Sequence, residues 1–277
     1  MISLSNVLFD VANALREDLG EGDVTAELLP IEKQVCATII ARESLVVCGT
    51  AWALQSFKSI DSTIAVEFFY NDGDVAKEGA TLCRMKGNAR AILTAERVAL
   101  NFLQLLSATS TKTRDYVNRI KHTRAQILDT RKTLPGLRYA QKYAVKCGGG
   151  RNHRMGLFDA FLIKENHIKA CGSIQEAVLL AKSKHSDKVI EVEVETLEEF
   201  QEALLVKPGV IMLDNFSLKN LQQAVNLKKE NKVKLEASGG ISVQTIKDIA
   251  ETGVDYISIG DITKSISAID LSLLVEG

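Results

Sequence analysis

The sequence predicts an α/β protein, and two observations support this fold class. After residue 125, short apolar runs alternate with longer segments whose apolar residues recur at helical spacing. Alternating strands and helices favour parallel strands joined by right-handed crossovers, and six such units within about 150 residues favour a β/α barrel. The 277 residues are 46% hydrophobic and 25% charged, values that are typical of a folded protein and exclude a disordered chain.

The first third of the chain has a mixed α+β pattern. Apolar spacing and β-branched runs predict two helices and three strands, over 7–18 and 49–60, and over 35–41, 64–70 and 81–85. Thr94 is a suitable N-cap, with Glu96 in the first turn, for a long helix that links the two parts of the chain. Met85-Lys86 resembles a biotin-carrier site, but Arg84 and Gly87 do not complete that motif.

The barrel region contains six predicted strands, over 126–129, 160–164, 189–195, 210–214, 233–237 and 256–259. The helices between them are predicted over 137–146, 173–184, 197–205, 218–229 and 243–252. An open, doubly wound sheet is the alternative architecture. The chain has no G-x-G-x-x-G after the first of these strands, and polar residues end several different strands, which favours a barrel.

Polar residues follow all six predicted strands, where the active site of a β/α barrel lies. In chain order they are Asp129-Thr130-Arg131-Lys132, Lys164-Glu165-Asn166-His167, Glu193 with Glu195, Asp214-Asn215, Glu236 with Ser238-Gly239-Gly240, and Gly260-Asp261. Any one of them alone is explained as a helix cap or a surface ion pair. Six at equivalent positions predict a functional site.

A cationic segment suggests that the ligand is anionic. Residues 112–154 contain twelve Lys or Arg and two acids, a charge of +10 in a chain of net charge −1. Arginine forks suit carboxylates, so Arg131, Arg154 and Lys164 could hold a small dicarboxylate. Lys164 could instead form a Schiff base, as in an aldolase. Nucleic-acid binding is disfavoured by a pI of about 6.5 and an aromatic content of 5%.

Two further motifs point to a phosphorylated substrate. In 191–195, Glu and Val alternate, so three carboxylates share one strand face, point into the barrel and need cations, hydroxyls or Mg²⁺ as partners. Residues 238–242, Ser-Gly-Gly-Ile-Ser, follow a strand and are expected to open a helix, where backbone N–H groups can bind a phosphate. Gly260 follows the next strand, and barrels often bind phosphate in these last two loops.

The sequence also predicts a cytoplasmic protein. The first residues lack the basic start of a signal peptide, and no apolar run approaches the roughly 20 residues that cross a bilayer. Five cysteines without a C-x-x-C pair are typical of reduced thiols, and the four histidines lack zinc-site spacing. We therefore expect no membrane contact and no zinc site.

Taken together, these residues resemble the quinolinate phosphoribosyltransferase family, the decarboxylating nicotinate-nucleotide pyrophosphorylases of NAD synthesis. The resemblance covers most of the chain and rests on motifs in a fixed order, at 17–23, 94–101, 129–138, 142–145, 148–154, 162–167, 191–195, 213–216 and 236–240. It implies an N-terminal α/β sandwich domain over 1–110 and an incomplete β/α barrel of six or seven strands over 111–277. It also implies a homodimer, or a higher oligomer built from it, whose active sites are shared between subunits.

The resemblance implies roles for individual residues. Quinolinate would be held by Thr130, Arg131, Lys132, His153, Arg154 and Lys164, and by the partner subunit's Arg97. Phosphoribosyl pyrophosphate would be held by Glu193 and Asp214, with Mg²⁺, and by Ser238, Gly239, Gly240, Ile259, Gly260 and Asp261. Lys132, Lys164, Glu193 and Asp214 would be catalytic, and no organic cofactor is expected. A related paralogue found in molybdenum transport operons shares the pattern and takes another ligand.

Overall fold

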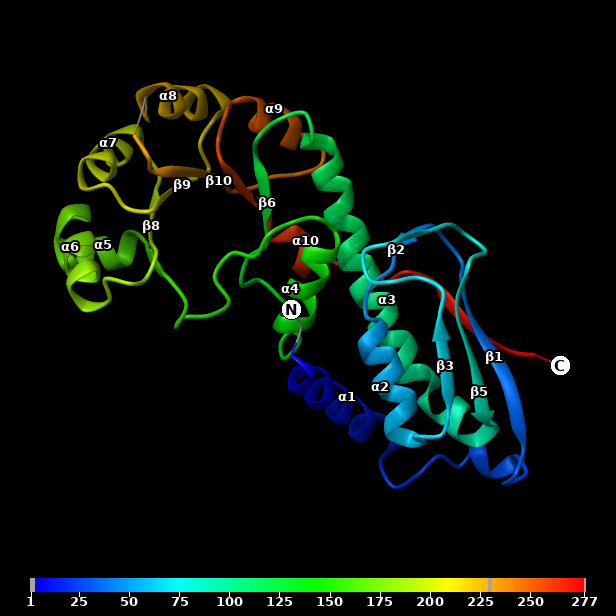
Figure 1. Cartoon of the computed structure of the whole chain (residues 1–277). Helices are drawn as coiled ribbons and strands as arrows, with labels where there is room; N and C mark the ends of the chain where they lie inside the picture. Colours follow the sequence, from blue (N-terminus) through cyan, green and yellow to red (C-terminus); the bar gives the residue numbers. More distant parts are fainter. Residues whose placement is uncertain (1–2, 229–230, 277) are drawn as a thin grey trace. The chain divides into compact units, whose positions relative to one another are not determined.

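The computed structural model describes residues 3–228 and 231–276 and divides them into two compact units. The first unit contains the chain up to residue 114, together with 133–149 and 262 onward; the second contains 115–132 and 150–261. The colours of Figure 1 follow the chain through both. The units are therefore interleaved in sequence, which differs from the expected single boundary between residues 110 and 111.

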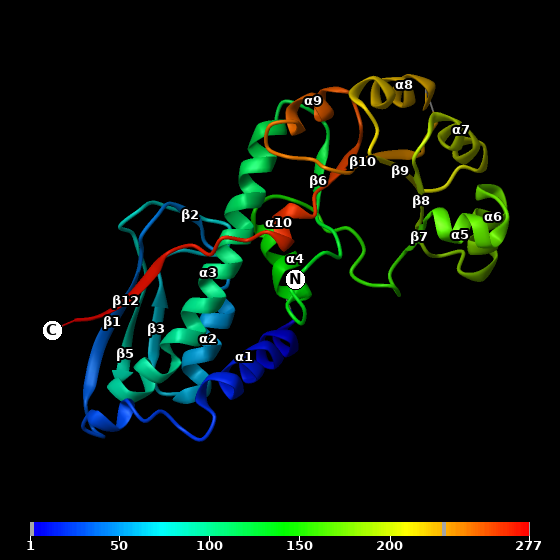
Figure 2. The ribbon, with the colours of Figure 1, turned by 180° about the vertical axis from the view of Figure 1, so that it is seen from behind.

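A four-stranded antiparallel sheet forms the base of the first unit, in the order β12-β1-β5-β3. Its strands are β12 (Leu271–Val275), β1 (Gln34–Ala41), β5 (Thr81–Asn88) and β3 (Ala65–Phe68). In β12, Leu271 lies opposite Ala41 of β1, so the end of the chain returns to the first sheet (Figure 2). The sequence pattern did not predict β12, because its partner strand lies at the other end of the chain. A short pair, β2 (Leu45–Val46) and β4 (Val75–Ala76), completes the unit's strands among the described residues.

Helices α2 (Thr50–Ile60) and α3 (Ala89–Ile120) cover one face of this sheet (Figure 1). The buried layer between them includes Ile39, Phe57 and Leu82, each with no exposed surface. This confirms the expected α/β sandwich. Helix α3 begins at Ala89, so the prediction that Thr94 is its N-cap is wrong: the Thr94 hydroxyl donates to Asp23 Oδ2 at 2.8 Å instead.

Two more helices pack beside α2 in a second hydrophobic cluster. Helix α1 (Leu4–Leu19) contributes Val7, Val11 and Leu15, and α4 (Arg138–Cys147) contributes two buried alanines. Trp52 of α2 is buried at their centre and donates from Nε1 to Asp10 Oδ2 at 3.0 Å. A single turn of 3-10 helix, η1 (Ala26–Leu28), follows α1. Helix α4 packs in this cluster, which places 133–149 in the first unit.

The second unit contains a six-stranded parallel sheet in the order β6-β11-β10-β9-β8-β7. Its strands are β6 (Gln126–Leu128), β11 (Tyr256–Ser258), β10 (Lys234–Ser238), β9 (Val210–Asp214), β8 (Ile190–Val194) and β7 (Phe161–Ile163). All six strands predicted for the barrel are present. Among the described residues β6 and β7 are not paired with each other, and beside β6 only Arg151 adds a single parallel bridge, to Leu128. The expected incomplete barrel is confirmed, with six strands.

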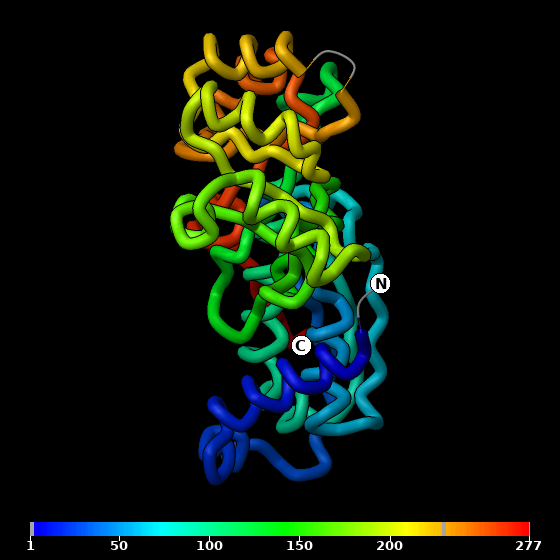
Figure 3. The backbone as a smooth tube through the Cα atoms, turned by 90° about the vertical axis from the view of Figure 1, so that its left-hand side faces the viewer, coloured from blue at the N-terminus to red at the C-terminus, as the bar shows by residue number. Residues whose placement is uncertain are grey.

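Helices follow the strands on the outer face of this curved sheet (Figures 1 and 3). They are α5 (Glu165–Cys171), α6 (Ile174–Lys184), α7 (Leu197–Val206), α8 (Leu218–Lys228) and α9 (Ile246–Glu251). The short α10 (Asp261–Lys264) begins at the last residue of the second unit, and its other residues belong to the first. The sequence did not predict α5. Helix α9 begins at Ile246 rather than at residue 243, and the last residue of the helix predicted over 218–229 lies outside the described residues. No helix in the described ranges is long and apolar enough to cross a membrane.

Candidate active site

A cavity of about 250 Å³ opens at the carboxyl ends of the parallel strands in the second unit. It is lined by Thr130, Arg131, Lys132, His153, Arg154, Leu162, Lys164, Glu193, Met212, Asp214, Ser238 and Ser258. These residues come from all six strands or the loops directly after them, and from the segment before β7. Because parallel strands end at the same edge of a sheet, residues more than a hundred positions apart are brought together.

The cationic side of the cavity is formed by Arg131 and Arg154. The Nε atoms of both side chains are buried and have no hydrogen-bond partner within the described part of the chain. Arg154 donates from Nη1 to the carbonyl oxygen of Ala160 at 3.1 Å. Burial, and the nearby charge of Arg131, lower the pKa of Arg154 from its ordinary value. Two half-buried guanidinium groups whose buried Nε donors lack partners among the described residues are costly in the absence of an anion, so this side of the cavity suits a carboxylate ligand.

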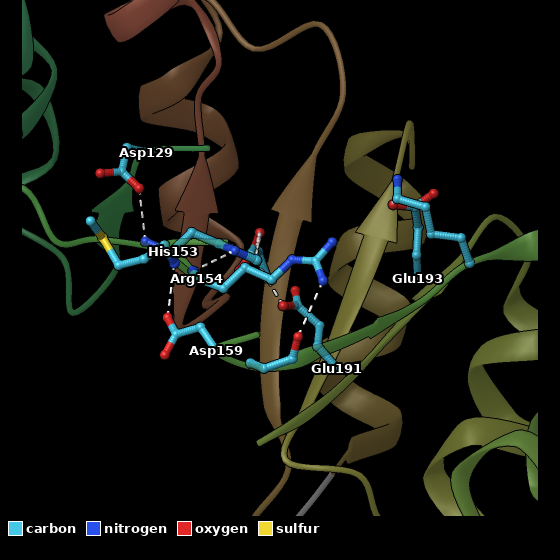
Figure 4. A network of polar contacts seen from close by, with 10 residues as sticks. Asp129, His153, Arg154, Asp159, Glu191 and Glu193 are labelled. Atoms are coloured by element: carbon cyan, nitrogen blue, oxygen red, sulfur yellow. Dashed lines mark hydrogen bonds and ion pairs between the residues drawn. The ribbon is translucent and has the colours of Figure 1, made fainter. Parts of the chain in front are cut away.

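His153 lines the cavity and lies near Arg154 and the buried Glu191 (Figure 4). Its main-chain N–H donates to Asp129 Oδ1 at 2.9 Å, and its Nδ1 accepts from the Arg154 N–H at 2.8 Å. Its Nε2 lies 2.8 Å from Glu191 Oε2 and 3.8 Å from Glu236 Oε1. Burial and the neighbouring Glu191 carboxylate raise the pKa of Glu236 well above its ordinary value. The contacts of the His153 ring to the Arg154 main chain and to Glu191 are therefore made within the protein.

The acidic side of the cavity is formed by Glu193 and Asp214. Lys164 Nζ donates to Glu193 Oε2 at 2.5 Å, so two residues that were expected to hold different substrates form an ion pair here. Asp214 ends β9 and accepts at Oδ2 from Asn215 Nδ2 at 2.8 Å. Both carboxylates line the same cavity as the arginines. A ligand that carries an anionic group at one end and hydroxyls or a bound cation at the other would match this arrangement.

Glycines shape the loop after β10. Gly239 has φ +97°, and a Cβ there would lie 2.1 Å from Asn215 Oδ1, so only glycine fits against the loop that follows β9. Gly240 has φ +56° with open space around it. The helix expected directly after this motif begins only at Ile246, and it is six residues long. Of this motif Ser238 lines the cavity, and no helix begins directly behind it.

Comparison with known proteins agrees with this geometry. The family model for the quinolinate phosphoribosyl transferase C-terminal domain matches residues 109–274, and the model for the N-terminal domain matches residues 23–107. The chain belongs to the quinolinate phosphoribosyltransferase family. The structure of the nicotinate-nucleotide pyrophosphorylase from Francisella tularensis superimposes with a TM-score of 0.97 at 47% identity, and covers 100% of this chain and 98% of that chain.

Curated relatives in the quinolinate phosphoribosyltransferase family cover most of the chain. A probable nicotinate-nucleotide pyrophosphorylase [carboxylating] of Bacillus subtilis is 41% identical over 93% of this chain and 89% of its own length. A nicotinate-nucleotide pyrophosphorylase [carboxylating] of Mycobacterium leprae is 39% identical over 98% of this chain and 99% of its own length. Both domains of the family are therefore present at nearly full length.

Nine of the residues expected in this family's site line the cavity: Thr130, Arg131, Lys132, His153, Arg154, Lys164, Glu193, Asp214 and Ser238. Gly260 lies beside them, since a Cβ there would be 3.0 Å from Lys132 Cδ. Ile259 is 2% exposed and donates its N–H to the Leu128 carbonyl, so its side chain belongs to the core. Asp261 starts α10 and interacts with Tyr116. Arg97 is exposed on α3, in the first unit.

Three lining residues were missed: Leu162, Met212 and Ser258. Each lies two positions before a strand-end residue that the sequence singled out, namely Lys164, Asp214 and Gly260. Side chains two apart on a strand share a face, so counting back by two from each strand end would have found them. Leu162 and Met212 provide apolar surface against which a ring could lie.

Two other clusters contain potential metal ligands within 4.8 Å of one another: His153, Glu191 and Glu236, and, in the first unit, Cys48, Asp72 and Cys147. In the second cluster, Asp72 accepts from the Thr50 N–H at the start of α2 and from the Tyr143 hydroxyl, at 3.1 and 2.8 Å. These contacts explain the position of Asp72 without a metal. All five cysteines are free thiols.

Proposed function

We propose that this chain transfers the phosphoribosyl group of phosphoribosyl pyrophosphate to quinolinate, with loss of CO₂, and so forms nicotinate mononucleotide and pyrophosphate for NAD synthesis. The observation that carries the proposal is the pair of buried Nε donors of Arg131 and Arg154, which have no hydrogen-bond partner in the part of the chain that the structure describes and share one cavity with Glu193 and Asp214. Family membership, and the names of relatives about 40% identical over nearly their whole length, support the same reaction.

In this reaction the cationic residues bind and orient the pyridine diacid. Arg131 and Arg154 would each present a fork to a carboxylate, and Lys132, Thr130 and Lys164 border the same space. Leu162 and Met212 would lie against the pyridine ring. Holding the ring nitrogen in line with the anomeric carbon converts a bimolecular encounter into an oriented reaction.

The acidic residues act at the sugar. When pyrophosphate leaves, positive charge develops at the anomeric carbon and the ring oxygen, and the carboxylates of Glu193 and Asp214 stabilise it. The pyridine nitrogen lone pair forms the new bond. The resulting positive ring nitrogen then stabilises the electron pair that CO₂ loss leaves on the adjacent carbon, and a proton from solvent forms the new C–H bond there, so the step needs no organic cofactor.

Glu193 and Asp214 also fit a magnesium-bound substrate. Mg²⁺ prefers oxygen ligands and usually binds through one or two carboxylates together with substrate phosphates. Glu193 and Asp214 offer two carboxylates on one side of the cavity. Magnesium would neutralise the departing pyrophosphate. Ser238, Gly239, Gly240 and Gly260 would surround the 5-phosphate.

We also propose a homodimer in which the partner subunit's Arg97 completes the quinolinate site. Arg97 is exposed on α3 and is therefore accessible to a second copy. Free thiols at all five cysteines support a cytoplasmic location. Sedimentation would test the homodimer. Turnover by mixed Arg97→Ala and Arg131→Ala subunits would test the shared site, since only the heterodimer would regain one complete site and with it activity.

The deciding experiment incubates the protein with quinolinate, phosphoribosyl pyrophosphate and Mg²⁺. Release of CO₂ together with nicotinate mononucleotide is the expected result. Nicotinate as the only accepted acid, or no turnover with any pyridine acid, would contradict the proposal. The aldolase alternative predicts a borohydride-trapped adduct at Lys164, which the same preparation can be tested for.

A further inference from the structure

We propose that Glu191 is a positioning residue, whose carboxylate holds the His153 ring and through it the Arg154 main chain, so that the Arg154 guanidinium points into the cavity. The kinetic part of this inference rests on the proposed function. The spectroscopic part does not, because it concerns the state of the His153 ring in the protein alone.

The segment that carries His153 and Arg154 has little regular structure of its own. It follows the single bridge at Arg151 and precedes β7. Asp129 anchors its start, since Oδ1 accepts from the His153 N–H at 2.9 Å and Oδ2 accepts from Asn152 Nδ2 at 2.5 Å. Beyond that anchor, side-chain contacts must hold the main chain in place.

The His153 ring provides such a contact on the ligand side of the anchor. Its Nδ1 accepts the N–H of Arg154 at 2.8 Å, so that nitrogen carries no proton and the neutral ring has its proton on Nε2. Nε2 lies 2.8 Å from Glu191 Oε2, a close polar contact that does not meet hydrogen-bond geometry. The ring therefore bridges the Arg154 main chain and the Glu191 carboxylate (Figure 4). This geometry differs from the role implied by family resemblance, in which His153 holds a quinolinate carboxylate directly.

Glu191 is placed for this task by β8. Period-2 alternation turns it into the barrel, while Val192 and Val194 point the other way and are fully buried. The side chains of Glu191 and His153 are 7% and 9% exposed, so water does not compete for their contact. Glu236 cannot replace Glu191, since its nearest oxygen lies 3.8 Å from Nε2. A second atom of Glu191, Oε1, is buried and has no hydrogen-bond partner among the described residues.

The kinetic test compares Glu191→Leu, which removes the polar contact to Nε2, with Glu191→Gln, which keeps an oxygen beside the ring and removes the charge. Loss of ring positioning should shift Arg154 and lower kcat/KM for quinolinate by about 10²-fold, the cost expected of a displacement near 1 Å. The KM for phosphoribosyl pyrophosphate should not change. Glu191→Gln should recover most of the loss. Glu198→Leu, on the exposed first turn of α7, is the matched control.

The spectroscopic test measures the ¹⁵N shifts of the His153 ring, which distinguish a protonated from a bare ring nitrogen. The chain has only four histidines, so a His153→Asn variant assigns the signals. We expect the neutral Nε2–H form in the wild type and in Glu191→Gln. In Glu191→Leu we expect averaging of the two ring forms.

Two results would overturn the inference: wild-type quinolinate KM and unchanged ring shifts in Glu191→Leu, or a Glu191→Gln variant as impaired as Glu191→Leu. Far-ultraviolet circular dichroism of each variant shows whether it has folded. If Glu191→Leu does not fold, the kinetics and ring shifts of Glu191→Gln still test the role of Glu191. If the wild type does not turn over quinolinate, the proposed function fails, whereas the ring shifts still decide the role of Glu191.

Discussion

Arg154→Ala is the sharpest test of the cationic site. Arg154 Nη1 already donates to the Ala160 carbonyl, which leaves the Nε and Nη2 edge for a ligand carboxylate. Two charge-assisted hydrogen bonds of roughly 1.5 to 3 kcal/mol each amount to about 3 to 6 kcal/mol. At about 1.4 kcal/mol for each factor of ten, removal of this fork should lower kcat/KM for quinolinate by about 10²- to 10⁴-fold.

The same variant should fold at least as stably as the wild type when no ligand is present. The Arg154 guanidinium is half-buried beside Arg131, and its buried Nε donor has no partner in the described ranges, so its removal relieves an electrostatic cost. The main-chain N–H of residue 154 remains for His153. Added quinolinate should raise the Tm of the wild type and leave that of Arg154→Ala unchanged.

The assay is steady-state turnover with quinolinate varied at saturating phosphoribosyl pyrophosphate, together with thermal unfolding. Arg124→Ala, which removes one exposed positive charge from the same unit, is the control for net charge. Wild-type kcat/KM in Arg154→Ala would refute the assignment of this side chain to the acid. A large loss of Tm without ligand would refute the argument that the site is electrostatically strained.

Four further outcomes are expected. Gly239→Ala should lower the free energy of unfolding by about 1 to 3 kcal/mol, because φ is +97° and the new Cβ would lie 2.1 Å from Asn215 Oδ1. Denaturant unfolding measures this loss, and an unchanged midpoint would contradict the prediction. Glu193→Gln should lower kcat by about 10²- to 10³-fold at saturating substrates, and full activity of this variant would contradict the proposed role of the carboxylate. Chelation of the metal should abolish wild-type turnover until Mg²⁺ is restored, and full activity in the chelator would contradict the proposed role of the metal. Burial raises the pKa of Asp10, although the hydrogen bond from the Trp52 N–H opposes this shift. The Asp10 carboxyl therefore binds a proton more tightly in the folded protein than in the unfolded chain. As a result, the free energy of unfolding falls as pH rises from the pKa of Asp10 in the unfolded chain to its pKa in the folded protein. Asp10→Asn should therefore raise the Tm at neutral pH, and its Tm should change less with pH between these two pKa values than that of the wild type. If Tm changes equally with pH in both proteins, Asp10 is not the group responsible.

Local patterns in the chain were enough to predict most of the second unit. All six parallel strands were found because each is a short apolar run, and because apolar runs alternate with helical periodicity regardless of what lies elsewhere in the fold. The same reasoning placed Arg131, Lys164, Glu193 and Asp214 at strand ends, where a parallel sheet brings them to one edge. The family resemblance added the substrates.

Other features were not accessible in this way, because they depend on which distant segments meet. Strand β12 was missed since its sequence gives no sign that it pairs with β1, at the far end of the chain. Helix α3 starts before Thr94 because that hydroxyl has a better partner in Asp23, which no local capping rule considers. The predicted Ser-Gly-Gly helix start failed because the loop continues to Ile246.

The chain's residue pattern was sufficient for the charge inventory of the site: which cations and carboxylates gather at the strand ends follows from strand periodicity alone. How those charges are paired required the folded arrangement. Lys164 contacts Glu193, and His153 turns its ring toward Glu191 and the Arg154 main chain, while the Nε atoms of Arg131 and Arg154 keep no partner among the described residues. Pairing depends on distances of a few ångströms between different strands, and these are set by sheet register and side-chain direction, which no single segment encodes.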